Sequence, residues 1–232
     1  MARAVTMPLM MARARQRANT EGATGFVSDF ELGDLINEGI AELWDLIRSA
    51  YGQDYFLSSA PFNTVPNQET YSLATLAADF LAFRGLDVIY GTNLVETARP
   101  FMFNERNRYK WTAGWAYTLP VYYRLEGSNL VLMPKPNGIY ACKLWYTPTS
   151  PIINYADTTT TFDGIAGWEE YAILWAAIRM LRKEGNSEDA GNLQQDMAAI
   201  KSRIDIMAAG RDADNPERVI DITRSDWLAG RY

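Results

Sequence analysis

Paired acidic side chains are the residues of this sequence whose type and spacing could do chemistry. A glycoside hydrolase needs two carboxyl groups that flank a sugar, one of them acting as the acid. The pairs are Glu169 with Glu170, Glu188 with Asp189, and Asp212 with Asp214. Glu169 and Glu170 fall in the first turn of an expected helix, where the helix dipole favours acids without any catalytic role. We therefore interpret this pair as structural.

Other catalytic apparatus is sparse. The 232 residues include no histidine, so the commonest general base and metal ligand is missing. The one cysteine, Cys142, excludes an internal disulfide framework and fits synthesis in a reducing compartment. It alternates with aromatic residues on an expected strand, which indicates a small buried hydrophobe. The sequence contains no phosphate-binding loop, CxxC or HExxH motif. We expect no catalytic residue, no metal and no cofactor.

Residues 104–111, NERNRYKW, interleave basic and aromatic side chains. Such a segment could stack on nucleic acid. A net charge of −6 argues against a general nucleic-acid binder, because phosphate binding needs clustered Lys and Arg. We favour a loop at a subunit interface or platform, with ordinary packing as a further possibility.

Helical patterns at both ends of the chain must position these residues. The helix expected at 28–51 has clear signals at both ends. Ser28 and Glu31 form a capping box at its start, and Val27 and Leu32 are spaced as a hydrophobic staple. Gly52 is the residue that ends it. Apolar residues recur at three- and four-residue spacing in each range. The expected helices cover about 6–19, 28–51, 167–184 and 188–208.

The last two helices read as an αα-hairpin, with Gly185 ending the first of them. Trp168 and Trp175 are expected in the core. The first apolar stripe contains Trp168, Tyr171, Leu174, Trp175, Ile178 and Leu181, and the second, narrower stripe contains Leu193, Met197, Ile200, Ile204 and Met207.

Between about 54 and 163 the pattern changes to short strands and turns. Residues 126–129 predict a hairpin with a four-residue loop. The strand over 139–147 is apolar on both faces, so both are buried or one meets another subunit. The long polar loop at 148–161 is expected to be functional or an assembly contact. The predicted fold class is α+β: a bundle of N- and C-terminal helices with a β-rich insertion, in a single domain of residues 1–209.

The N-terminal segment carries Arg13, Arg15 and Arg17 on different faces of its helix, so at least one should point at solvent or at an acidic or phosphate-bearing partner. Its apolar part is short and contains Pro8, which indicates a helix rather than a signal peptide. No apolar run reaches the ~20 residues of a membrane span.

Residues 210–232 lack a helical stripe, but they hold a β-prone patch at 219–222 and the isolated anchors Trp227 and Leu228. This composition predicts an extended arm that orders on a partner. The alternative is a tail that folds back on its own domain.

Three blocks in the same order resemble a known family: residues 26–56, 123–151 and 162–190. They begin FVSDFELGDL, YRLEGSNLVL and FDGIAGWEEY, and they are similar to head-to-tail adaptor (connector) proteins of tailed bacteriophages. The likeness is to adaptors that dock on the portal, particularly in short-tailed phages, and it covers most of residues 5–209.

The resemblance implies a homo-oligomeric ring of twelve copies under the portal, with helices in the wall and the β-rich part projecting. Such a ring extends the DNA channel without sequence-specific binding and offers a platform to a downstream tail or nozzle protein. The protein would be made in the host bacterial cytoplasm and reside at the head–tail neck of the virion. The implied portal-docking arm comprises Arg218, Ile220, Ile222, Arg224, Trp227, Leu228 and Tyr232. The expected subunit or tail interface comprises Arg106, Arg108, Tyr109, Trp111, Trp115 and Trp145.

Acidic charge suits a wall around passing DNA, and surplus aromatic residues suit subunit interfaces. Two alternatives remain open. One is a ring of the neck or tail tube that does not touch the portal. The other is a peptidoglycan-degrading virion enzyme, an activity that has been credited to some related adaptors.

Overall fold

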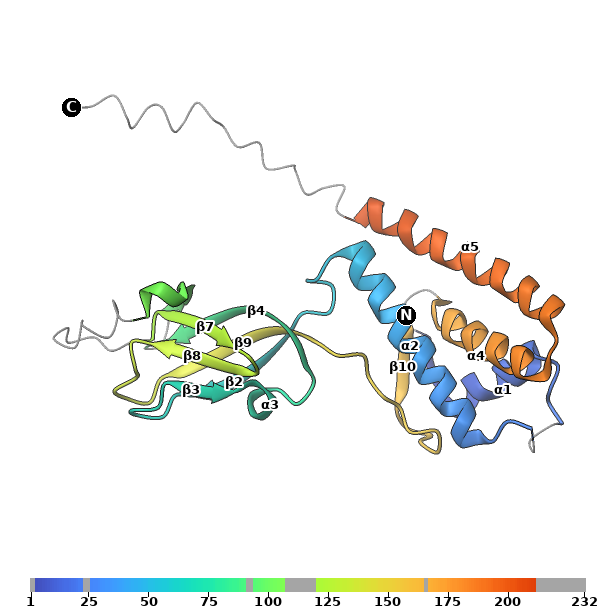
Figure 1. The fold of residues 1–232 in the computed structure, drawn as a ribbon, viewed down its shortest axis with the longest axis horizontal. Coiled ribbons are helices and arrows are strands. Elements are labelled where there is room, and N and C mark those ends of the chain that lie inside the picture. Colours follow the sequence, from blue (N-terminus) through green and yellow to red (C-terminus); the bar gives the residue numbers. More distant parts are fainter. Residues whose placement is uncertain (1–2, 23–25, 91–93, 107–119, 165–166, 212–232) are drawn as a thin grey trace, which may run out of the picture. The chain divides into compact units, whose positions relative to one another are not determined.

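The computed structural model describes residues 3–22, 26–90, 94–106, 120–164 and 167–211 (Figure 1). The chain divides into a helical unit, Met1–Gly52 with Ile152–Tyr232, and a β unit, Gln53–Pro151. The predicted fold class is confirmed: helices come from both ends of the chain and the middle is rich in strands. The division into an adaptor domain of residues 1–209 and an arm stays a prediction.

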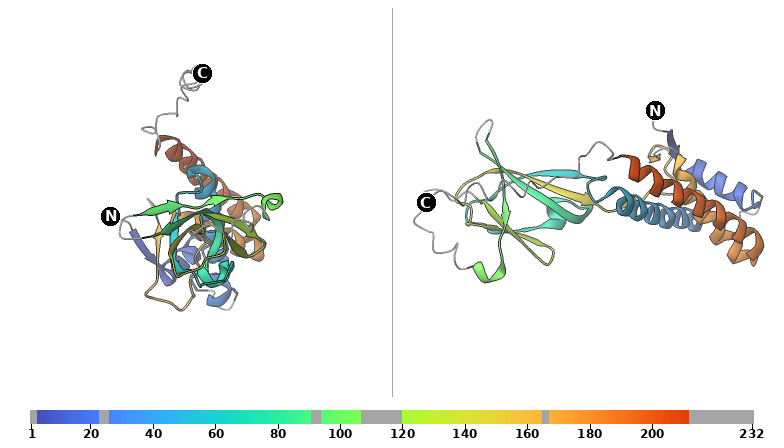
Figure 2. Two further views of the ribbon diagram at one scale, coloured as in Figure 1. Left: turned by 90° about the vertical axis from the view of Figure 1, so that its left-hand side faces the viewer. Right: turned by 90° about the horizontal axis from the view of Figure 1, so that it is seen from above.

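Four long helices and a two-stranded ribbon make up the described part of the helical unit, and the helices run side by side (Figure 2). Each helix lies within three residues of its predicted range. The elements are β1 (Arg3–Thr6), α1 (Met7–Arg17), α2 (Asp29–Tyr51), β10 (Thr161–Gly164), α4 (Glu169–Glu184) and α5 (Ser187–Arg211).

The predicted start and stop of α2 are confirmed. The Ser28 hydroxyl accepts a hydrogen bond from the backbone N–H of Glu31 at 3.2 Å, which satisfies one of the free donors of the first turn. Val27 and Leu32 are both fully buried beside it. Gly52 ends the helix at a φ of 84°, a conformation that favours glycine.

Helix α4 is the centre of the bundle because α1, α2 and α5 all pack against it. Small side chains such as Ala172 let its neighbours approach closely. At Gly39 of α2, an added Cβ would lie 2.9 Å from the Ala172 Cα, so only glycine fits the crossing. The predicted stripe of α4 is buried except at Trp175, which is half-buried, and Gly185 ends the helix in the left-handed region.

Helix α5 covers α4 and α2 with a narrower stripe. Ile204 is buried, and Leu193, Met197 and Ile200 are half-buried. Met207, predicted to belong to this stripe, is exposed instead. The reason is length, since α5 has 25 residues and α4 only 16, so the last turns of α5 extend past the helix that they would cover.

The ribbon of β1 and β10 was not predicted. The strands pair antiparallel, from Arg3 opposite Gly164 to Thr6 opposite Thr161. Because β1 runs directly into α1 and β10 lies just before α4, the ribbon joins the starts of these two helices. Thr6 occupies the predicted capping position of α1, but its side chain makes no capping hydrogen bond.

The β unit contains two four-stranded sheets. Residues 95–100 contribute to both, because β5 pairs with β4 and β6 pairs with β7. The core lies between the sheets and includes Leu86, Leu130, Leu132 and Leu144. The first sheet has the order β2 (Ser58–Asn63), β9 (Ala141–Pro148), β4 (Phe80–Ile89), β5 (Val95–Thr97), and the second the order β3 (Thr70–Ser72), β8 (Asn129–Met133), β7 (Tyr122–Glu126), β6 (Arg99–Pro100). The short helix α3 (Leu73–Leu76) follows β3.

The hairpin of β7 and β8 has a tighter turn than predicted. Glu126 pairs with Asn129, so only Gly127 and Ser128 form the loop, in place of a four-residue loop. Gly127 has a φ of 58°, which a two-residue hairpin turn requires and which glycine adopts at low cost.

The predicted polar loop at 148–161 packs on α2 over part of its length. The Asn37 side chain donates to the Ile153 carbonyl at 2.9 Å and accepts from the Ile153 N–H at 3.0 Å. Tyr155 covers Gly33, where a Cβ would come within 2.6 Å of the tyrosine Cβ. The loop therefore belongs to the packing of the helical unit over residues 153–155.

Candidate functional site

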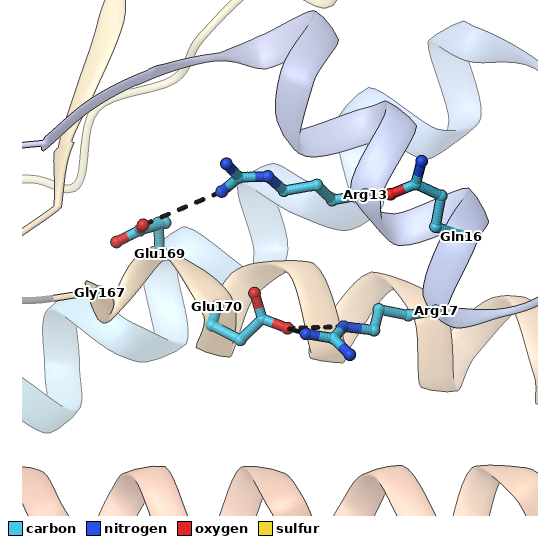
Figure 3. Close-up of a pocket in the computed structure, with 6 residues that line it drawn as sticks. All are labelled: Arg13, Gln16, Arg17, Gly167, Glu169 and Glu170. Atoms are coloured by element: carbon cyan, nitrogen blue, oxygen red, sulfur yellow. Dashed lines mark hydrogen bonds and ion pairs between the residues drawn. The ribbon is translucent and has the colours of Figure 1, made fainter.

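A surface pocket of about 500 Å³ lies where α1 meets the start of α4 (Figure 3). The ribbon places this part of the chain, because it leads into both helices. The lining is polar and charged and consists of Arg13, Gln16, Arg17, Gly167, Glu169 and Glu170.

Arg13 and Glu169 form the inner pair of the pocket. The guanidinium Nη1 lies 4.0 Å from a carboxylate oxygen of Glu169. The arginine side chain is 23% exposed and the glutamate side chain only 2%. A carboxylate that is buried to this extent needs a nearby cation, and Arg13 supplies it.

Arg17 and Glu170 form the outer pair. The guanidinium donates to one carboxylate oxygen through Nε at 2.8 Å and approaches it through Nη2 at 2.7 Å. The arginine side chain is 55% exposed and the glutamate 27%. A pair this open to water contributes about 0–1 kcal/mol to stability. In both pairs the arginine is nearer the solvent than the carboxylate.

This arrangement supports electrostatic contact better than acid–base chemistry. Glu169 and Glu170 are successive residues in the first turn of α4, each beside an arginine, and they do not face each other across a sugar-sized gap. Glu188 and Asp189 likewise lie in the first turn of α5, where the Asp189 N–H donates to the Asn186 side chain. Asp212 and Asp214 lie outside the described residues.

Cys142 is buried among the core residues of the β unit. Burial raises the pKa of its thiol to about 12, so the thiol is protonated at neutral pH. Over the ranges that the structure describes, no three His, Cys, Asp or Glu residues gather as a metal site. Over those same ranges, no helix is long and apolar enough to cross a membrane.

Arg106, a predicted interface residue, follows the short 3₁₀ helix η1 (Phe103–Glu105). Its guanidinium lies 4.1 Å from the centre of the Phe103 ring and donates to the Phe103 carbonyl at 3.0 Å. Arg124 of β7 also lies over this ring, at 4.9 Å. Phe103 and its neighbour Met102 are exposed, so two arginines flank an apolar side chain at the surface.

Trp145, the other described interface residue, lies on β9 and is half-buried. Its indole N–H donates to the Asp87 carboxylate at 2.6 Å, and the Lys143 ammonium lies 3.9 Å from its ring centre. Gly85 is its register partner on β4. On the core side of β9, Cys142, Leu144 and Tyr146 are buried. On the other side Lys143 and Trp145 are half-buried and Ala141 is exposed, so this face is not fully buried. That it meets another subunit, the alternative predicted from the sequence, stays a prediction.

The remaining predicted site residues lie outside the described part of the chain. They are Arg108, Tyr109, Trp111 and Trp115 of the interface set, and Arg218, Ile220, Ile222, Arg224, Trp227, Leu228 and Tyr232 of the arm. The structure therefore places Arg106 and Trp145 in the β unit, on different elements.

The pairing of Arg13 and Arg17 with Glu169 and Glu170 was not predicted. A signal was present, because the first 20 residues contain four arginines and no acid, and Arg13 and Arg17 share a helix face at a spacing of four. The sequence did not indicate which acids pair with these arginines, since Glu169 and Glu170 lie about 150 residues away along the chain.

Comparison with known proteins identifies the family. A family model described as the SU10 adaptor protein matches residues 7–220, nearly the whole chain. No curated protein matches the chain. The family match agrees with the predicted resemblance to phage head-to-tail adaptors and extends past residue 209; the likeness to short-tailed phages stays a prediction. The chain belongs to the SU10 adaptor protein family, whose members are structural connector proteins of the phage virion.

Proposed function

We propose that this chain forms a ring of twelve copies beneath the portal, joins the DNA-filled head to the tail, and extends the DNA channel. The observation that carries the proposal is the family match over residues 7–220. The copy number, the portal contact and the channel come from the resemblance to portal-docking adaptors. The protein is made in the host bacterial cytoplasm and resides at the neck of the virion.

The distribution of charge supports a wall around DNA. Without the proposed arm, residues 212–232, the helical unit contains 16 acidic and 11 basic residues, a net charge of −5, whereas the β unit contains 7 acidic and 8 basic residues, a net charge of +1. Acidic walls repel the phosphate backbone and let a duplex pass without binding. The helical unit is therefore the better candidate for the channel wall.

Two surfaces of the β unit are proposed as subunit or tail contacts. One is the exposed Phe103 between Arg106 and Arg124. The other is Trp145, held by Asp87 beside Lys143. Aromatic and arginine side chains are the residues most enriched where protein surfaces meet. Arg108, Tyr109, Trp111 and Trp115 belong to the same proposed interface.

The docking arm was predicted over residues 210–232. Because α5 continues to Arg211, the proposed arm is shortened to residues 212–232. The anchors are the apolar residues Ile220, Ile222, Trp227 and Leu228, with Arg218, Arg224 and Tyr232 as polar contacts. Buried tryptophans often dominate the binding energy of such segments.

Co-sedimentation with portal rings of the same virus tests the proposal. We expect the full chain to sediment with the portal and a chain ending at Arg211, which keeps all of α5, to stay in the supernatant. If both chains form rings and neither binds the portal, the protein is a neck or tail-tube component. A zymogram against peptidoglycan is expected to be blank, and a clear band that disappears on replacing a carboxylate pair would support the enzyme instead.

A further inference from the structure

The pocket between α1 and α4 presents positive charge to the solvent. Both of its ion pairs expose the arginine more than the glutamate, at 23% against 2% for Arg13 and Glu169 and 55% against 27% for Arg17 and Glu170. Gln16, also exposed, adds an amide on the same rim. The pocket is neutral in total, but its outer layer consists of cationic and hydrogen-bond-donating groups.

The Arg13 guanidinium has N–H groups that its contact with Glu169 does not use. A guanidinium carries five N–H groups, and the 4.0 Å contact with Glu169 is the sole ion pair of Arg13 among the described residues. An approaching carboxylate could accept from this guanidinium, a geometry that arginine favours. A volume of about 500 Å³ admits one or two acidic side chains.

The outer face of α2 has the opposite character. Asp34, Glu38, Glu42 and Asp45 recur at three- and four-residue spacing, and all four are exposed. In the described chain, Asp45 alone among them has a cationic partner, Arg48, and there the carboxylate is the more exposed group at 66% against 30%. Like charges at this spacing repel one another along a helix, and among the described residues only the Asp45–Arg48 pair offsets that repulsion.

The two surfaces cannot meet within one copy. The residues of α2 that pack inward, such as Ile36 and Ile40, lie on the side of the helix opposite the acidic face. Most of that face therefore points away from α4, although Glu42 at its edge is close enough to act on Tyr171 of α4, whereas the pocket is built on α1 and α4 (Figure 3). Two different, complementary patches on one chain are what a head-to-tail contact between identical subunits requires, and such contacts form a ring when the rotation between copies closes.

We propose that the Arg13–Arg17 pocket of one copy receives the acidic outer face of α2 from the next copy. This proposal depends on the proposed ring, and it specifies which two surfaces of neighbouring copies meet in that ring. Charge complementarity fixes the direction of assembly and speeds the encounter of subunits. It also predicts that ring formation weakens with salt, because both surfaces are open to solvent.

Two charge variants, each altering one surface, test the contact. Gln16→Glu with Arg17→Gln makes the pocket more negative by two charges and leaves the buried pair of Arg13 and Glu169 untouched. Glu38→Lys with Glu42→Lys reverses two charges of the α2 face at exposed positions. Each variant alone should raise the protein concentration at half-assembly on portal rings about tenfold or more, as measured by light scattering. Circular dichroism should show unchanged helix content.

Mixing the two variants gives the decisive result. In an alternating ring with an even number of copies, the altered pocket meets the altered α2 face, and the unchanged pocket meets the unchanged face. An equal mixture should therefore assemble within about threefold of the unchanged chain. A mixture that assembles no better than either variant alone would overturn the contact.

A matched control separates local from global charge. Gln194→Glu with Lys201→Gln makes the same two changes of charge on the exposed side of α5. This control should assemble like the unchanged chain, and a loss of assembly in the control as large as in the test variants would also overturn the contact.

The outcomes distinguish this contact from the proposed ring. If the unchanged chain assembles and both test variants assemble as well as the unchanged chain, the ring stands and this contact is wrong. If the unchanged chain never forms a ring, the proposed function fails and the contact fails with it.

Discussion

The three arginines of α1 illustrate how burial assigns roles to residues of the same type. Arg13 and Arg17 border the pocket, whereas Arg15 is buried and donates through Nη2 to the Val27 carbonyl at 2.9 Å and to Asp29 at 2.8 Å. Arg15 therefore ties α1 to the turn that starts α2. The prediction that all three arginines face different directions was wrong for Arg13 and Arg17, which are four residues apart and line the same pocket. Spacing alone could not tell which arginine points inward, because that depends on where α2 and α4 pack.

Removing Arg15 should cost far more stability than removing Arg17. Arg15→Ala leaves the Val27 carbonyl without its donor and a gap in the packing, so we expect a loss of about 1–3 kcal/mol in the free energy of unfolding. Arg17→Ala removes a solvent-exposed pair and should cost about 0–1 kcal/mol. Urea denaturation of both variants measures the difference, and equal losses would contradict the assigned roles.

Cys142 should make stability fall in alkaline solution. Burial raises the pKa of its thiol to about 12 in the folded chain, whereas an unfolded cysteine titrates near about 8.5. A raised pKa in the folded state means that the stabilising contribution is complete below the pKa of the unfolded state and is lost as pH rises toward 12. We expect Cys142→Ala to flatten the fall in unfolding free energy above about pH 9.

Reaction with a thiol reagent provides an independent check. The thiol of Cys142 should label slowly at neutral pH in buffer and rapidly in urea. Fast labelling of the native protein would place Cys142 at the surface and contradict its position in the core.

At the scale of elements, the helices were predicted well because their ends carry local signals. Ser28 and Glu31 act through a hydrogen bond inside one turn, and Gly52 and Gly185 adopt the positive φ that ends a helix. Neither effect depends on the rest of the fold. The ribbon of β1 and β10 was missed for the opposite reason, since two four-residue strands about 155 residues apart carry no periodicity, and only their pairing makes them strands.

The crossing of α2 and α4 at Gly39 gives a test of element packing. An alanine there would bring its Cβ to 2.9 Å from the Ala172 Cα and 3.0 Å from the Trp175 Cβ, so the helices must separate. We expect Gly39→Ala to lower the unfolding free energy by about 1–3 kcal/mol.

Gly191 of α5 supplies the matched control. No atom lies within 4 Å of its added Cβ, so Gly191→Ala should raise the unfolding free energy by up to about 1 kcal/mol through helix propensity. Thermal or urea unfolding of the pair should give shifts of opposite sign. A stabilising Gly39→Ala would contradict the close approach of the two helices.

At the scale of the whole molecule, composition and order predicted the fold class, and the structure adds that the net acidity resides in the helical unit. That unit combines two segments of the chain separated by the β unit, Met1–Gly52 and Ile152–Tyr232. The sequence predicted that both ends supply helices. It could not predict the pocket, because the arginines and glutamates that line it meet only when α1 and α4 are side by side.

Trp227 tests the assignment of the C-terminal arm. Trp227 lies outside every periodic segment of the sequence, so Trp227→Ala should leave the helix content and the unfolding midpoint of the chain unchanged. It should reduce portal binding about tenfold or more, as expected for a tryptophan anchor. Sedimentation with portal rings measures the binding, and thermal melting measures the fold. A drop in melting temperature like that of Gly39→Ala would show that Trp227 packs on its own domain.

The mass of the assembly on the portal shows directly whether this chain forms the proposed ring. Light scattering with negative-stain imaging would compare portal rings alone, with the full chain, and with the chain ending at Arg211. We expect the full chain to add the mass of about twelve copies as a ring on one face of the portal, following the ring symmetry of such connectors. The shortened chain should add none. If the full chain adds no mass to the portal, it is not a portal-docking ring.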